Sequence, residues 1–418
     1  MEKKIYLLSA DMGYGHQRAA FPLRHLADGA SITVNDYEGI NEKERKYWQS
    51  SLKSYEFISR FKKIPLLGDL IFAIMDEMQE IKPFYPFRDL SPLSFQQRFF
   101  LRSIKSGVGK GLIEKLVQVP RPIVSTFFVA TYFTEFFNYP EKVYQVVCDS
   151  DASRAWGPIK PDSKTIYFLP NEQLKTRFLM YGVAPERLVV TGFPLPKENI
   201  GENKEILKTD LAGRLWRLDP SGRFQTKYKG LISQYGLELE KEGGPTHLAF
   251  AVGGAGAQKE IAVKLAENLQ KLLIEKQIKL TLIAGTRKEI KGYFDEELAK
   301  LGLTSLVTVL WAPTKDEYFD KFNALIRQID LLWTKPSELS FYCALGLPII
   351  MSETIGSQED FNRRWLLELG AGIDGPAPEH AAQWLVDCQR SGRLAKAALD
   401  GFLNAESMGT YNIEKIIG

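Results

Sequence analysis

The sequence predicts an α/β protein built from two Rossmann-like domains, and three observations lead to this fold class. Short apolar runs alternate with helix-like segments along most of the 418 residues. This alternation is typical of an open parallel sheet with right-handed crossovers. The pattern starts afresh near Pro245, and each half opens with a strand that leads through a glycine-rich turn into a helix.

The first half begins with an apolar run at 5–9, as expected of a strand buried on both faces of a parallel sheet. A glycine loop from Asp11 to His16 follows, and then a helical stretch that we expect to reach Leu26. Asn171 is the predicted N-cap of a helix over 171–181. The further predicted strands are 31–36, 123–126, 143–148, 165–169 and 188–191.

The second half repeats this order with a strand at 247–252 and a glycine turn at 252–257. The helix that follows has one apolar face at helical periodicity, made of Ile261, Leu265, Leu269, Leu272 and Leu273. Later strands are predicted at 279–284, 307–310, 330–334 and 348–351.

We therefore expect an N-terminal Rossmann-like domain over 1–195 and a C-terminal domain over 245–418, whose last helix is a candidate to pack back on the first domain. The polar stretch 196–244 connects them, and it is long enough to hold a helix of its own.

Composition excludes several classes of function. The formal net charge is only +3, so no global field for nucleic acid is expected. The three cysteines and four histidines are scattered, which predicts neither a disulfide framework nor a metal site. The first apolar run ends at Asp11, too early for a signal peptide, and no run approaches the roughly 20 apolar residues of a spanning helix. We expect a cytoplasmic protein, with peripheral attachment at the inner face of the membrane left open.

The segment from about 55 to 118 departs from the sheet pattern. Ten aromatic residues lie between Tyr55 and Gln118, interleaved with lysines and arginines. We expect a helical insertion in the N-terminal domain. One interpretation is that the aromatic rings pack on that domain while the charges are solvated. The other is a surface that docks on an anionic membrane or forms an acceptor groove.

The two glycine turns indicate binding of a phosphate-bearing ligand. In open parallel sheets, ligands bind at the carboxyl ends of strands, where glycines let backbone amides approach an anion. Neither turn matches the strict dinucleotide fingerprint, and no G-K-[ST] loop is present. NAD binding and P-loop phosphoryl transfer are therefore poorly supported.

A series of motifs occurs in the order found in one enzyme family. They are the glycine loop 9–16, Val147-Cys148-Asp149, segments 168–172 and 191–194, the turn 251–256, Thr334-Lys335-Pro336 through Gly346-Leu347-Pro348, then Gln358, Glu359, Asn362 and Gly370-Ala371-Gly372. Together they resemble the processive diacylglycerol and monogalactosyl-diacylglycerol glycosyltransferases, relatives of the peptidoglycan transferase MurG. The resemblance touches nearly the whole chain except 196–244. It implies the GT-B fold, in which two facing Rossmann domains hold a nucleotide-sugar mainly through the C-terminal one.

The resemblance also implies roles for particular residues. Diphosphate binding falls to Gly253, Gly254 and Gly256, the base to Leu310 and Trp311, and the sugar hydroxyls to Gln358 and Glu359 with Asn362 close by. An inverting transfer needs a base, and a histidine with an ordinary pKa of about 6.5 suits that role. His16 is the candidate, in the loop of Gly13 and Gly15, with Asp11 and Asp149 as carboxylate alternatives. The donor would be a UDP-sugar, and neither a metal nor a further cofactor is expected.

Purely structural roles remain open for several of these residues. A histidine in a turn is more often a capping or packing residue, and Gln358, Glu359 and Asn362 also suit the exposed start of a helix. The Asp149-Ser150-Asp151 triplet superficially matches a metal-binding D-x-D motif, but we expect it to be part of a loop at the edge of the sheet and not a metal site.

One position departs from the family. The relatives carry a ribose-binding glutamate five residues before the glycine of the G-L-P motif, where this chain has Phe341. Glu338, one helical turn earlier, either takes over that role or ribose recognition is altered. The leading hypothesis is metal-independent, inverting transfer from a UDP-sugar to a lipid or other hydrophobic acceptor. The alternatives are a nucleotide-sugar epimerase of the same fold and a catalytically silent nucleotide-sugar-binding protein.

Overall fold

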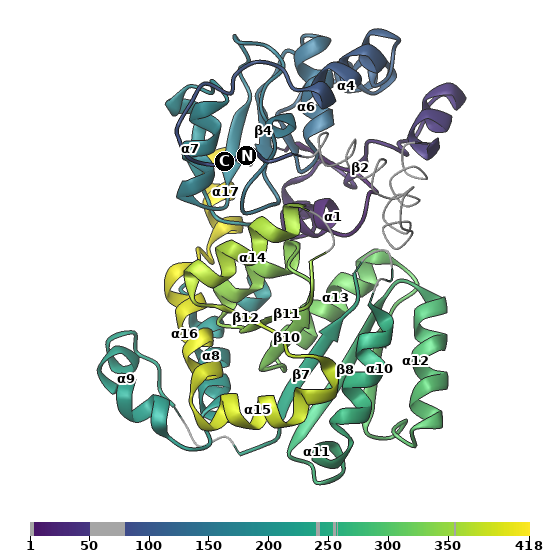
Figure 1. The fold of residues 1–418 in the computed structure, drawn as a ribbon. Coiled ribbons are helices and arrows are strands. Elements are labelled where there is room, and N and C mark those ends of the chain that lie inside the picture. The colour runs from purple at the N-terminus through teal and green to yellow at the C-terminus, as the bar shows by residue number, and fades with distance from the viewer. Residues whose placement is uncertain (1–3, 51–79, 240–242, 254–255, 257, 355–356) are drawn as a thin grey trace. The chain divides into compact units, whose positions relative to one another are not determined.

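The computed structural model describes residues 4–50, 80–239, 243–253, 256, 258–354 and 357–418. The chain divides into two compact units. The first comprises Met1–Pro194, Ile355–Phe361 and Met408–Gly418, and the second comprises Leu195–Thr354 and Asn362–Ser407. Each unit contains one six-stranded sheet in which every pairing is parallel, which confirms the predicted fold class (Figure 1).

The sheet of the first unit has the strand order β2-β1-β3-β4-β5-β6. Strand order reverses beside β1, so the topological switch point of this sheet lies between β1 and β3. In open α/β sheets, ligands bind outside the carboxyl ends of the strands at such a point. The strands are β1 (Tyr6–Ser9), β2 (Ile32–Thr33), β3 (Ile123–Ser125), β4 (Val143–Val146), β5 (Ile166–Leu169) and β6 (Leu188–Val190).

The sheet of the second unit has the order β12-β11-β10-β7-β8-β9, which is the Rossmann order, with its switch point between β7 and β10. The sequence did not predict β12, a strand of three residues that follows the Gly370-Ala371 pair. The strands are β7 (Thr246–Ala251), β8 (Ile278–Gly285), β9 (Val307–Trp311), β10 (Leu331–Thr334), β11 (Ile349–Met351) and β12 (Gly372–Asp374).

Two predicted helices are divided in the structure. The helix after the glycine loop is α1 (Gly15–Ala20), and the 3-10 helix η1 (Phe21–Leu26) continues it. Pro22 lies in the first turn of η1 and has no N–H to extend the α-helical pattern. The helix after β7 consists of α10 (Lys259–Asn268) and α11 (Gln270–Ile274).

The helix α7 (Glu172–Met180) begins as predicted at its N-cap. The Asn171 side chain accepts a 2.8 Å hydrogen bond from the Leu174 amide, which satisfies one of the orphan donors of the first turn.

The insertion is described only from residue 80 onward, so its members Phe57, Phe61 and Phe72, with Arg60, Lys62 and Lys63, lie outside the described residues. From residue 80 the chain has no helix before α4 (Phe95–Lys105), which precedes α5 (Lys110–Leu116). No helix in the described ranges is long and apolar enough to cross a membrane.

The stretch 196–244 belongs to the second unit and contains two helices, α8 (Glu205–Leu218) and α9 (Arg223–Gln234). Its polar composition had predicted a connecting segment between the domains. Part of that polarity is internal, since Arg214 of α8 is fully buried.

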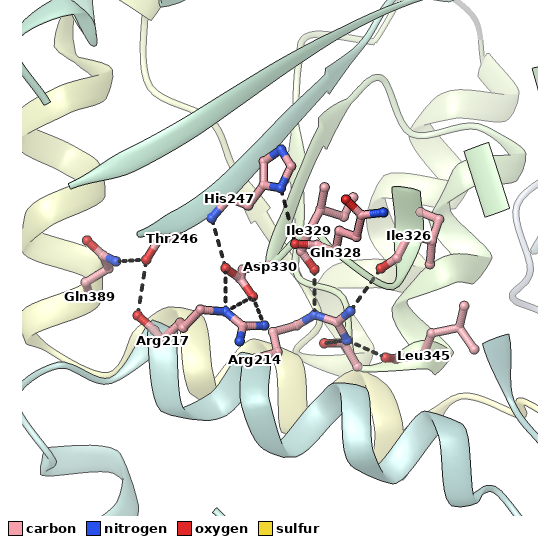
Figure 2. A network of polar contacts seen from close by, with 11 residues as sticks. Arg214, Arg217, Thr246, His247, Ile326, Gln328, Ile329, Asp330, Leu345 and Gln389 are labelled. Carbon is pink, nitrogen blue, oxygen red and sulfur yellow. Dashed lines mark hydrogen bonds and ion pairs between the residues drawn. The ribbon is translucent and has the colours of Figure 1, made fainter. Parts of the chain in front are cut away.

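The Arg214 guanidinium donates to four backbone carbonyls, as Figure 2 shows. Its Nε donates to Ile329 at 3.0 Å, its Nη1 to Leu345 at 2.7 Å and Gly346 at 3.1 Å, and its Nη2 to Ile326 at 3.2 Å. Burial lowers the pKa of Arg214 to about 10, and the side chain therefore keeps its charge at neutral pH.

Beside it, Arg217 forms an ion pair with the buried Asp330, at 2.8 Å between Nη2 and Oδ1 (Figure 2). The other oxygen of Asp330 accepts a 2.9 Å hydrogen bond from the His247 amide. Asp330 and His247 lie at the amino ends of β10 and β7, which is the edge of the sheet opposite to the ligand-binding edge. This arginine network is therefore structural.

The last helix, α17 (Gly409–Ile417), is part of the first unit, and Figure 1 marks both chain ends there. Ile413 and Ile417 pack in one core cluster with Ile5 and Leu7 of the N-terminal strand region and with Leu23 of η1. The Asn412 side chain also donates to the Thr191 carbonyl at 2.8 Å.

Replacing Ile413 by alanine should lower the free energy of unfolding of the first unit by about 2–5 kcal/mol, because the side chain is fully buried in this cluster. Ile416→Ala is the matched control, since Ile416 lies on the same helix and is 38% exposed. Urea denaturation followed by circular dichroism measures both. Equal shifts in the two variants would show that the helix is not packed through Ile413.

Candidate functional site

The glycine loop of the first unit is held at its beginning by the chain that follows β2. The Asp11 amide donates to the Asn35 side chain at 2.9 Å, and the Asn35 amide group donates back to the Asp11 carbonyl at 3.1 Å. Gly13 has a φ of +96°, a conformation that side-chain-bearing residues rarely adopt. Asp11 is exposed at this edge, and its backbone fixes the loop.

The end of the same loop is held by Thr126, the residue after β3. His16 Nδ1 lies 2.6 Å from the Thr126 carbonyl oxygen, and the Thr126 hydroxyl donates to the His16 carbonyl at 2.7 Å. These bonds join the loops after β1 and β3, so His16 lies at the switch point of the first sheet. The rings of Phe127 and Trp156 lie beside the imidazole, with centroids 5.1 and 5.9 Å away.

The two aspartates of the triplet after β4 differ in burial and in their contacts. Asp149 is half-buried near the same edge of the sheet. Asp151 is buried and forms an ion pair with Arg177, with 2.9 Å from Nε to Oδ1 and 2.7 Å from Nη2 to Oδ2. Arg177 also donates to the Lys82 carbonyl at 2.9 Å. Asp151 is thus part of the packing. Across the described ranges, no group of three or more His, Cys, Asp or Glu residues could hold a metal ion.

The glycine turn after β7 is bordered by two cations from the strands on either side. A Cβ on Gly253 would lie 2.8 Å from Cε of Lys335, which follows β10. A Cβ on Gly256, whose φ is +72°, would lie 2.9 Å from Ile290 and 3.7 Å from Cδ of Arg287, which follows β8. A turn that lacks side chains at Gly253 and Gly256 and lies between two cations suits an anion such as a diphosphate.

The sequence analysis included Lys335 in the Thr334-Lys335-Pro336 motif but predicted no role for it, and it did not single out Arg287. Lys335 directly follows β10, a strand at the switch point, and a basic residue at that position could have been predicted to bind an anion. Arg287 carried no signal in the sequence, because its place beside Gly256 depends on how α12 (Lys288–Lys300) begins against the sheet.

The other expected donor-binding residues lie on several elements. Leu310 and Trp311 end the edge strand β9 and are half-buried. Helix α14 (Ser357–Leu369) carries a half-buried Gln358 and the buried Glu359 and Asn362. Gln358 and Glu359 group with the first unit and Asn362 with the second. Gly254 lies outside the described residues.

Phe341 is a packing residue of the second unit. It is buried, and its ring lies 5.1 Å from the ring of Trp365. The segment that contains it, η5 (Glu338–Leu345), is a 3-10 helix rather than the expected α-helix. Residues three apart are eclipsed in a 3-10 helix, so Glu338 shares the side of η5 that bears Phe341 but remains half-buried.

Gly346, which ends η5, is required by packing on α8. Its φ is +67°, and a Cβ there would lie 2.5 Å from Leu211.

Comparison with known proteins gives relatives at low identity. A processive diacylglycerol β-glucosyltransferase of Bacillus pumilus is 21% identical over 389 residues, which are 89% of this chain and 82% of the relative. The chain resembles diacylglycerol glucosyltransferases. The protein of the same name from Staphylococcus saprophyticus is 24% identical over 270 residues, covering 64% of this chain and 57% of the relative.

The fold has a solved counterpart. The crystal structure of Acinetobacter baumannii MurG matches with a TM-score of 0.51 and 11% identity, and the match covers 99% of each chain. At that identity the likeness shows the GT-B fold. A family model described as a domain of unknown function, DUF6938, matches residues 302–415.

Binding of UDP should depend on the cations beside the glycine turn. UDP is expected to raise the melting temperature of the parent protein, because a ligand that binds only the native state stabilises it. Gly253→Ala should reduce this shift by displacing the Lys335 side chain, and Lys335→Ala should reduce it by removing the charge.

Lys229→Ala is the control, an exposed lysine on α9. A UDP-induced shift that is the same in all four proteins would exclude the turn as the diphosphate site.

Proposed function

We propose that this protein transfers a sugar from a UDP-sugar to a lipid or other hydrophobic acceptor, with inversion and without a metal. The observation that carries the proposal is that each sheet brings one half of the required chemistry to its switch point. The first sheet presents His16, anchored at Thr126. The second presents a glycine turn bordered by Lys335 and Arg287.

The second unit would bind the donor and stabilise its leaving group. Negative charge grows on the diphosphate as the bond to the sugar breaks, and preorganised donors at that place lower the barrier. The Gly256 amide donates to the Gly253 carbonyl at 2.7 Å and holds the turn, and a side chain at either glycine would meet Lys335 or Ile290. The glycines thus keep the backbone open to a diphosphate beside these cations. Lys335 and Arg287 supply positive charge, which supports departure of UDP without a metal ion.

The first unit would activate the acceptor. In the proposed reaction, His16 takes the proton of the acceptor hydroxyl while its oxygen forms a bond to the anomeric carbon of the sugar. The bond between that carbon and the β-phosphate oxygen breaks, and its electron pair leaves with UDP. Attack from the opposite side of the ring inverts the anomeric centre. Asp11 and Asp149 remain the carboxylate alternatives as base.

Recognition of the nucleoside is proposed to differ from that of the relatives. Phe341 is committed to packing on Trp365, so it offers no ribose ligand. Glu338 is half-buried on the same side of η5 and is the acidic group proposed to replace it. Leu310 and Trp311 are proposed to contact the base, and Gln358, Glu359 and Asn362 the sugar.

A hydrophobic acceptor is supported by the outward face of α4. Phe95, Arg98, Phe99 and Arg102 follow one another at helical spacing and are all exposed. The opposite face is packed, with Gln97 and Ile104 buried. An exposed stripe of aromatic and basic side chains is suited to an anionic membrane surface.

A second aromatic group precedes α4. Tyr85 is 71% exposed and Phe87 61% exposed, and both rings pack against Phe84 at centroid distances of 5.1 and 5.4 Å. Arg88 donates to the Pro83 and Pro86 carbonyls and so stabilises this loop from within. The loop therefore presents aromatic surface in a defined conformation, which adds to the proposed membrane contact.

Replacing His16 by alanine should lower the rate of sugar transfer by about 10²–10⁴-fold, the usual contribution of a general base. The assay follows UDP release and glycolipid formation from UDP-glucose and diacylglycerol in mixed micelles. His380→Ala is the control, since His380 is exposed beyond the sheet of the second unit.

Full activity of the His16→Ala protein would remove His16 as the base. A parent protein that binds UDP-sugars but turns over none of them would favour the silent binding protein. Conversion of a UDP-sugar to its epimer without an acceptor would favour the epimerase.

Anionic vesicles should bind the protein through the α4 face. The double variant Arg98→Ala/Arg102→Ala should weaken binding to phosphatidylserine vesicles by about tenfold or more at low salt, at roughly 1 kcal/mol for each basic side chain near the surface. Phe95→Ser/Phe99→Ser should weaken it also at high salt. Co-sedimentation measures both, with Val119→Ser, an exposed apolar residue 55% accessible, as control. Unchanged binding in both double variants would exclude this face.

A further inference from the structure

The imidazole of His16 is held through a carbonyl group, and this determines which of its nitrogens carries a proton. Nδ1 lies 2.6 Å from the Thr126 carbonyl oxygen. A carbonyl oxygen can only accept a hydrogen bond, so the contact requires a proton on Nδ1. The same carbonyl lies 3.5 Å from the Cys148 thiol, which is a second donor to it.

Thr126 is itself fixed in place. It is fully buried, and its amide donates to the Leu8 carbonyl of β1 at 3.0 Å. Its hydroxyl donates to the His16 carbonyl at 2.7 Å, so backbone and side chain of His16 are both bound to one residue. The buried rings of Phe127 and Trp156 both pack beside the His16 imidazole and restrict its rotation.

We infer that Thr126 is a positioning residue that holds neutral His16 in the Nδ1–H tautomer, with Nε2 as the only nitrogen able to take a proton. In serine hydrolases a carboxylate orients the catalytic histidine in this way. Here a main-chain carbonyl at the switch point orients the imidazole, and the threonine hydroxyl sets the distance between the two loops. Proton transfer to and from His16 therefore occurs at Nε2 in every step.

This inference rests on the proposed function for its catalytic meaning, because it names the atom that receives the acceptor's proton. The acceptor hydroxyl must approach Nε2, on the side of the ring away from Thr126. The imidazolium formed keeps its Nδ1 bond to the carbonyl, and that bond becomes charge-assisted when the ring is protonated.

The tautomer is tested directly by ¹⁵N NMR of the full-length protein with labelled histidines. The spectra are recorded at a pH high enough for the imidazole to be neutral. His16→Gln identifies the His16 signals among those of the four histidines. The expected result is a one-bond proton coupling at Nδ1 and an unprotonated Nε2. A proton on Nε2, or rapid exchange between the two tautomers, would overturn the inference.

Thr126→Val removes the hydroxyl and keeps the size of the side chain, whereas Thr126→Ser keeps the hydroxyl. Thr126→Val should reduce kcat about tenfold to a hundredfold, as small misplacements of catalytic groups do, with a smaller change in KM. The main-chain carbonyl remains in this variant, so the hydroxyl acts only by keeping that carbonyl at hydrogen-bond distance from Nδ1. When this distance is no longer held, His16 of the valine protein should also show the second tautomer. Thr126→Ser should restore both properties. If the valine protein keeps the parent tautomer and the parent kcat, the Thr126 hydroxyl does not position the ring.

Failure of His16 as the base and failure of Thr126 as its positioning residue give different results. An Nδ1–H tautomer in a protein whose His16→Ala variant is fully active would leave the geometry in place and remove the proposed base. An Nε2–H tautomer with an inactive His16→Ala variant would leave the base and remove Thr126 as its positioning residue. Should Thr126→Val fail to fold, the tautomer of the parent protein still decides the inference.

Discussion

The second unit depends on one buried cation that has no carboxylate at hydrogen-bond distance among the described residues. Arg214 instead donates to carbonyls at the end of α13 (Lys315–Ile326), before β10 and at the end of η5. Helix ends carry unsatisfied carbonyls and partial negative charge, and these offset the cost of burying the guanidinium. The contacts fix β10 and η5 against α8. Lys335 directly follows β10 and Glu338 begins η5, so a constraint at the amino edge of the sheet positions residues at its carboxyl edge.

The two sheets use polar residues in a comparable way. In the first, the buried pair of Arg177 and Asp151 holds the chain at Lys82 next to α7. In the second, Asp330 joins Arg217 to the start of β7. Removing one partner of such a buried pair leaves an uncompensated charge, so these pairs are costly to break even where they add little net stability. Sequence patterns place charged side chains such as these in solvent, but here the buried ion pairs hold the elements of each unit together.

Much of the fold was predictable, because apolar strands and glycine turns are local features. Eleven of the twelve strands were expected, and both turns lie at switch points. The missed features depend on tertiary contacts. From the sequence alone Arg214 is expected at the surface, and only the packing of α8 shows that it is buried. Phe341 has the appearance of a lost ribose ligand until the structure shows its ring against Trp365. Arg287 lies near Gly256 only because of how β8 and α12 pack. The pairing of His16 with Thr126, 110 residues apart, has no signal in one sequence.

The return of α17 to the first unit has a consequence for how the gene can be divided. A contiguous fragment ending near Pro194 would lack Ile413 and Ile417 and would expose the apolar surface they cover on η1 and β1. The first unit is therefore not a module that one cut in the chain can release. Recombination or engineering that exchanges the second unit must take residues from about 195 to 407 as an internal cassette. This cassette includes the segment Ile355–Phe361, which groups with the first unit, and it leaves both chain ends with their own sheet.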